Sequence, residues 1–139
     1  MKPVALRGTL IVLAHMIVLL GHGMAHSHLR IEPSPWQRAF ILVVIFAAPG
    51  IAAPVLWTPW QKSGVVLLGL SLAGSLVFGL YYHFLAAGVD SVFNPIHTRW
   101  DVGFRLTAGL LALVEITGCA WCSGFWQSIG NSGFTKKKS

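Results

Sequence analysis

The histidines are the side chains whose spacing points most directly to chemistry. The chain has six of them, and His15, His22 and His26 are separated by seven and then four residues. At 100° per residue of α-helix, these three fall within about 40° of one another on one face. The four-residue step between His22 and His26 lets two imidazoles approach one ion from adjacent turns, as in helical zinc sites. The spacing therefore predicts a metal-binding face, and His28 lies on the other side of the helix.

Two later segments bring further candidate ligands to the same end. His83 lies near the end of an apolar block that runs in the same direction as the first, and the segment before the last block contains Asp90, His97 and Asp101. Neutral imidazole suits zinc, copper and iron, including haem iron. We therefore predict a transition-metal site (Cu, Zn or Fe) with His22, His26 and His83 as core ligands, completed by His97 or Asp101.

The same histidines would also suit a single haem b. In membrane b-type cytochromes, histidines on two helices of a bundle ligate iron from opposite faces, and a pairing of His22 or His26 with His83 resembles that arrangement. Glycines beside them, such as Gly23 and Gly79, would leave room for a flat macrocycle. Glycines at these places also let helices pack closely without any ligand. Metal ion, haem and helix packing are thus three interpretations of one pattern.

A second polar group is expected deeper in the membrane. His15 and Glu115 each lie about 13 residues from the same end of their apolar blocks, which is about 20 Å along a helix. Pro49 falls at a similar depth, and a proline there frees a backbone carbonyl one turn earlier, near Ile45. We predict that His15 pairs with Glu115, either as a proton or ion relay or as a buried polar contact between helices.

The two cysteines form a C-x-x-C motif, Cys119 and Cys122, at the other end of the last block. Two thiols one helical turn apart can bind a soft metal or form a disulfide. The outline resembles four-helix quinone-linked thiol oxidoreductases, but their reactive cysteines face the oxidising side and come in more than one pair. Small apolar residues at a helix end are the simpler interpretation of this single pair.

The elements that position these residues are four apolar blocks, at residues 9–29, 36–57, 64–88 and 102–122. Hydrophobic residues make up 55% of the chain and charged residues 10%, far fewer charges than a soluble domain carries. Each block has the roughly 20 residues that a helix needs to cross a bilayer. The blocks lack both the polar stripe of a soluble bundle helix and the alternation of a barrel strand. We predict an all-α integral membrane four-helix bundle of up-down topology, a single domain spanning residues 1–139.

The basic residues predict the orientation of the bundle. Six of the ten basic residues lie on one side, with no acidic residue among them. The other side has four arginines and three of the four acidic residues. The positive-inside rule then places both termini in the cytoplasm and the histidine cluster at the outer face of the cell membrane. Anchoring to the bilayer explains the net charge of +6, and no nucleic-acid partner is needed. The six are Lys2, Arg7, Lys62, Lys136, Lys137 and Lys138.

The first block also fits a cleavable signal peptide, with small residues up to Ala25 as the cleavage site. Cleavage would leave His26-Ser27-His28 at the new N-terminus. That string is similar to the start of mature periplasmic copper-binding proteins of the β-sandwich resistance family. Nothing downstream resembles a β-sandwich, so an intact first helix is the preferred interpretation.

Two functions fit these patterns. The first is a multi-pass membrane protein that binds a metal or haem at its outer face and has a redox or metal-handling role. The alternative is a non-catalytic subunit or assembly factor of a larger membrane complex, or a homo-oligomer, whose histidines pack helices or hold a pigment. The sequence has no phosphate-binding loop, nucleophile triad or paired carboxylates, which argues against hydrolytic and nucleotide-driven chemistry.

Overall fold

The computed structural model describes residues 2–95 and 97–135, and every regular element in this part of the chain is a helix. Four stretches are long and apolar enough to cross a membrane. The protein is therefore an all-α, multi-pass membrane protein, as the apolar blocks predict. The first span is α1 (Lys2–Leu29), and the fourth is α5 (Arg99–Thr135). The second span consists of α2 (Pro35–Phe40), the π-helix η1 (Ile41–Ala47) and α3 (Ala48–Val55). The third consists of α4 (Gln61–Gly79) and the π-helix η2 (Leu80–Leu85).

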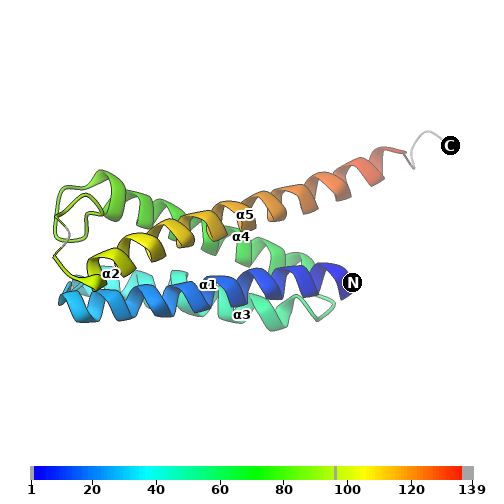
Figure 1. The fold of residues 1–139 in the computed structure, drawn as a ribbon. Helices are drawn as coiled ribbons and strands as arrows, with labels where there is room; N and C mark the ends of the chain where they lie inside the picture. Colours follow the sequence, from blue (N-terminus) through cyan, green and yellow to red (C-terminus); the bar gives the residue numbers. More distant parts are fainter. Residues whose placement is uncertain (1, 96, 136–139) are drawn as a thin grey trace.

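Successive spans run in opposite directions, and the four lie side by side (Figure 1). The loops that follow α1 and η2 lie together at one end of the bundle, which we call the histidine end because His22, His26 and His83 lie beside it. The N-terminal end of α1 and the connection between α3 and α4 lie at the opposite end. α5 extends beyond the other helices there (Figure 1). This arrangement is the predicted up-down bundle.

The first and last helices are longer than the apolar blocks. α1 begins at Lys2 rather than at residue 9, and α5 covers Arg99–Thr135 rather than 102–122. The backbone stays helical because its hydrogen bonds do not stop at the membrane surface. Long basic side chains such as Arg7 can bury their stems and extend their charges toward water. Composition therefore marks the membrane-embedded part of a helix, and the helix itself continues past it.

Local signals set the bounds of the second and third spans. The second begins at Pro35, after the N-cap Ser34, whose N–H donates to Gln37 Oε1 at 2.7 Å. Proline suits this first helical position because its missing N–H would have had no partner there. The third span ends at Leu85 rather than at residue 88, because Ala86 adopts an extended backbone.

The bundle is held together by two apolar clusters, one in each half. In the half away from the histidine end, Leu56, Leu68 and Leu72 are completely buried among α1, α3, α4 and α5. Gly118 of α5 permits this close packing, because a Cβ there would collide with the Leu72 side chain. The second cluster surrounds Phe104, next to the histidines. Many large apolar side chains point outward instead, as expected of a surface that faces lipid.

The second span contains a π-helix just before Pro49, where one backbone donor is missing. The N–H of residue 49 would pair with Ile45 O in an α-helix and with Val44 O in a π-helix, but proline has no N–H. Side chains from two other helices donate to these carbonyls. His15 Nε2 of α1 lies 3.0 Å from Ile45 O, and the Ser71 hydroxyl of α4 donates to Val44 O at 2.8 Å. The proline thus coincides with polar contacts that tie the second span to the first and the third.

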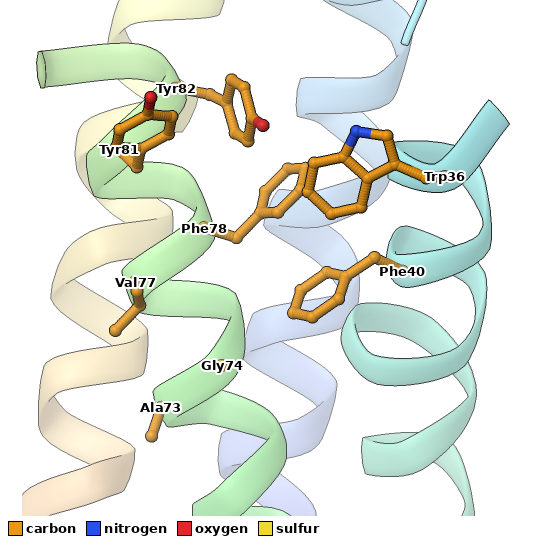
Figure 2. Close-up of a pocket in the computed structure, with 8 residues that line it drawn as sticks. All are labelled: Trp36, Phe40, Ala73, Gly74, Val77, Phe78, Tyr81 and Tyr82. Carbon is orange, nitrogen blue, oxygen red and sulfur yellow. The ribbon is translucent and has the colours of Figure 1, made fainter. Parts of the chain in front are cut away.

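Aromatic side chains join the second and third spans near the histidine end (Figure 2). Phe40 and Phe78 stack with ring centroids 5.0 Å apart and planes inclined by 9°, and Trp36 and Tyr82 pack around them. The rings line an open groove of about 600 Å³ on the outside of the bundle. Because the side chains that line it are almost all apolar, we interpret this groove as part of the lipid-facing surface.

Candidate metal centre

Three imidazoles converge at the histidine end. His22 and His26 come from adjacent turns of α1, and His83 comes from η2. The Nε2 atom of His22 lies 3.1 Å from Nε2 of His26 and 3.2 Å from Nε2 of His83. The ligand atoms of all three residues lie within 4.8 Å of one another. The structure therefore brings together the three residues that the sequence indicates as core ligands, and the group could hold a metal ion.

The segment after η2 folds back over this cluster. The N–H of Val92 donates to the carbonyl of His83 at 2.9 Å, which closes the loop directly above the histidines. Asp90 is thereby placed beside two of the imidazoles. Its carbonyl lies 3.1 Å from His83 Nδ1, and its carboxylate oxygen Oδ1 lies 3.7 Å from His26 Nδ1.

Two of the three imidazoles, His22 and His83, have a hydrogen-bond partner for the second ring nitrogen. The Thr107 hydroxyl donates to the carbonyl of Gly103 at 2.7 Å, so its oxygen accepts from His22 Nδ1–H at 2.9 Å. His83 Nδ1 faces a carbonyl, which can only accept, and therefore also carries the proton. His26 Nδ1 lies 3.7 Å from the Asp90 carboxylate oxygen Oδ1, beyond hydrogen-bonding distance. The hydrogen bonds thus assign one tautomer, Nδ1–H, to His22 and His83.

This tautomer leaves the Nε2 atoms of His22 and His83 unprotonated and 3.2 Å apart, and His26 Nε2 lies 3.1 Å from His22 Nε2. Two bare acceptors at such a distance repel each other unless a cation lies between them. Three nitrogens at 2.0–2.1 Å from a tetrahedral zinc ion would be separated from one another by about 3.3 Å. Metal-bound histidines also typically donate the other ring N–H to a carboxylate, carbonyl or similar acceptor. The two Nε2 separations from His22 agree with this value, and His22 and His83 have outer partners of this kind.

Phe104 covers one side of the cluster. Its ring stacks on His22 at a centroid distance of 5.0 Å and makes edge contacts of 5.2 Å with both His26 and His83. The Phe104 side chain is buried. Access to the three Nε2 atoms is therefore restricted on this side.

The two predicted outer ligands lie elsewhere. Asp101 accepts from the N–H of His97 at 3.1 Å and from the N–H of Thr98 at 2.7 Å, where it caps the start of α5. Both predicted residues line a separate cavity, on the side of Phe104 and Arg105. The acid that adjoins the histidines is Asp90. The sequence places it in the same loop as the other two candidates, and only the fold of that loop distinguishes it from them.

The deeper polar pair lies between α1 and α5. His15 is completely buried, and its Nδ1 lies 3.6 Å from Glu115 Oε1. The same carboxyl oxygen accepts a hydrogen bond from the Ser75 hydroxyl of α4. Within the described part of the chain, His15 Nδ1 has no partner at hydrogen-bonding distance. Since Nε2 faces the Ile45 carbonyl and carries a proton, Nδ1 is an acceptor directed at another acceptor.

The cysteines lie in the opposite half of the bundle. Cys119 and Cys122 are free thiols on α5, and Cys122 is buried in the apolar cluster of that half. Its side chain packs where α5 passes Gly69 of α4. This placement agrees with the interpretation of the pair as small packing residues.

Comparisons with protein-family models, with curated proteins and with solved structures find no match to this chain. Its function is therefore argued from the geometry of its own side chains.

Proposed function

We propose that this protein binds one transition-metal ion, zinc or copper, through His22, His26 and His83 at the outer face of the cell membrane. The observation that supports this most is the convergence of the three imidazoles, with Nδ1 of His22 and of His83 each already hydrogen-bonded to an acceptor. The site draws on two spans and a loop. Its side of the membrane follows from the lysine distribution.

The geometry favours a metal ion over haem. Two axial histidines of a haem lie on opposite faces of the macrocycle, whereas His22 and His83 are close enough for their Nε2 atoms to be 3.2 Å apart. A third imidazole, from His26, points to the same place. Phe104 packs against all three rings and fills space that a porphyrin between them would need.

The geometry also favours a metal over helix packing alone. Histidines used only for packing would alternate donor and acceptor nitrogens, so that each short contact contains one proton. Here the outer partners hold the protons of His22 and His83 on Nδ1, so the 3.2 Å contact between their Nε2 atoms contains none. A group of this kind in an apolar setting is costly unless a cation neutralises it. The same argument counts against a purely structural subunit of a larger complex.

Three protein ligands leave one position of a tetrahedral site open. Structural zinc sites usually have four protein ligands, while sites that bind or transform an exogenous molecule keep an open position. A metal-handling or redox role suits the site better than a purely structural one for this reason.

The test is metal content per protein for the parent and for His22→Ala, His26→Ala and His83→Ala. Removing a first ligand should reduce affinity by at least the 10–100-fold that loss of an outer partner costs. Binding should weaken at acidic pH, because protonated imidazole cannot ligate. His28→Ala is the matched control, since His28 donates from Nδ1 to Met24 O and stacks on Trp100, away from the cluster. A parent that takes up neither zinc nor copper would refute the proposal.

We further propose that His15 and Glu115 share one proton. His15 Nδ1 and Glu115 Oε1 are both acceptors 3.6 Å apart in a dry interior, and only a proton between them makes the contact favourable. The groups facing the pair are the Ile45 carbonyl from η1, the Ser75 hydroxyl from α4, and Cys119 one turn farther along α5. None of these three groups offers a second charge of opposite sign.

Histidine-selective ¹⁵N NMR tests this second proposal. In the parent, the His15 Nδ1 signal should show a bound or hydrogen-bonded proton, and in Glu115→Leu it should move to the position of a free lone pair. Glu115→Gln should stay close to the parent, because its amide N–H can donate to the same atom. Asp90→Asn is the control and should leave the His15 signals unchanged. Identical spectra for the parent and Glu115→Leu would show that no proton is shared.

A further inference from the structure

A cavity of about 340 Å³ lies beside the histidine cluster, between the membrane-spanning helices and the loops at the histidine end. His22, His26 and His83 all line one end of it, together with Asp90. Most of the remaining wall is apolar, including Leu19, Ile41, Ile45 and Phe78 from α1, η1 and α4. The loop after α1 and two polar side chains complete it: Ile31, Pro33, Ser27 and Gln37. The volume is at the lower end of the range found for small-molecule sites.

The open position of the proposed metal faces this cavity. Phe104 occupies the other side of the three imidazoles, and the loop after η2 covers them from above. The remaining side is the one on which all three rings border the cavity. A molecule bound there would have its polar atom on the metal and its body against apolar side chains.

We infer that the fourth metal position takes a small, lipid-soluble molecule with one nitrogen, oxygen or sulfur donor. The inference rests on the proposed metal site and adds to it the class of ligand. Sites of this shape gain affinity from apolar burial and orientation from a few polar groups. A hydrated or strongly polar ligand would lose its solvation without finding partners on the apolar part of the cavity wall.

Gly23 provides a direct way to fill the cavity. It lies on α1 next to His22 and lines the cavity, and a Cβ at this position would meet no atom of the described residues within 4 Å. Gly23→Leu should therefore project into the cavity without displacing the histidines. Gly109 of α5 also has open space around its Cβ position, and it is not among the residues that line this cavity. Gly109→Leu is the matched control.

The experiment uses the full chain loaded with Co²⁺, whose visible absorption reports changes in coordination. Imidazole and 4-phenylimidazole are titrated in the same detergent, so that partitioning of the probes is equal for all variants. In the parent, the phenyl group should strengthen binding by about 10- to 100-fold, the effect of burying one apolar ring. Gly23→Leu should keep Co²⁺ and lose this preference, and Gly109→Leu should match the parent.

The outcomes separate the two proposals. Failure of the parent to bind Co²⁺ at one ion per chain would overturn the metal site itself. Stoichiometric Co²⁺ with an equal preference in the parent and in Gly23→Leu would overturn only the lipid-soluble ligand. If Gly23→Leu loses the metal, Ile41→Phe on the η1 wall of the cavity takes its place, with the same expected result.

Discussion

At the scale of single residues, the partners of the ring nitrogens matter as much to the proposed metal site as the three histidines themselves. Thr107 illustrates this, because its hydroxyl donates to its own helix and so must accept from His22. It fixes the tautomer of the ring that lies between the other two. No sequence motif marks this role, since a threonine about two turns inside an apolar helix looks like a packing residue.

We expect Thr107→Val to weaken zinc affinity by about 10–100-fold while the protein stays folded. Valine keeps the shape of the side chain but removes the acceptor, so the proton of His22 is no longer held on Nδ1. Competition titration against a zinc chelator measures the effect.

Thr117→Val on the same helix is the control for that measurement. Its hydroxyl likewise donates to a carbonyl of its own helix, at Leu113, but it is exposed and lies farther along α5, away from the histidine end. Equal zinc affinities for the parent and both variants would show that Thr107 does not orient the ligand.

At the scale of the elements, Pro49 lacks a backbone donor, and side chains of neighbouring helices donate to the backbone carbonyls before it. The proline removes a backbone donor, and the two carbonyls before it, at Val44 and Ile45, accept from Ser71 of α4 and His15 of α1. The second span is therefore attached to both of these helices at one depth. This explains why a proline is tolerated in the middle of a membrane-spanning segment.

A double-mutant cycle between Pro49 and Ser71 tests this dependence. Ser71→Ala should lower the free energy of unfolding by about 0.5–2 kcal/mol, because it leaves a buried carbonyl without a donor. In a Pro49→Ala background the same change should cost much less, since the alanine supplies a backbone N–H. Ser123→Ala is the control, because its hydroxyl bonds within α5 and is exposed. Equal costs of Ser71→Ala in both backgrounds would contradict the argument.

Sequence patterns predicted the four spans and brought His22, His26 and His83 to one end of the bundle, because both depend on spacing within single helices. They did not predict the π-helices η1 and η2, since a π-turn depends on how neighbouring helices pack. They also placed His97 and Asp101 in the ligand shell, where the structure puts Asp90 next to the histidines. The path of a loop is set by contacts such as the hydrogen bond from Val92 to His83, which have no signature in the sequence.

At the scale of the whole molecule, the orientation in the membrane follows from the basic residues. We expect a reporter fused after Ser139 to be cytoplasmic and one inserted near Asn94 to be external, because the lysines favour the inner side. Paired alkaline phosphatase and fluorescent protein fusions at each position provide the measurement. The reverse pattern would place the histidine end on the cytoplasmic side.

The position of the three histidines in the chain has a consequence for assembly. A metal held by His22 and His83 would cross-link the first and third spans and close a loop of 61 residues. Ligands from α1 and η2 come together only after both spans are inserted and the loop above them has folded. The metal would then bind only to a fully assembled bundle. Removal of the metal should loosen the histidine end first. The opposite half, where Leu56, Leu68 and Leu72 are packed, would continue to hold the bundle together.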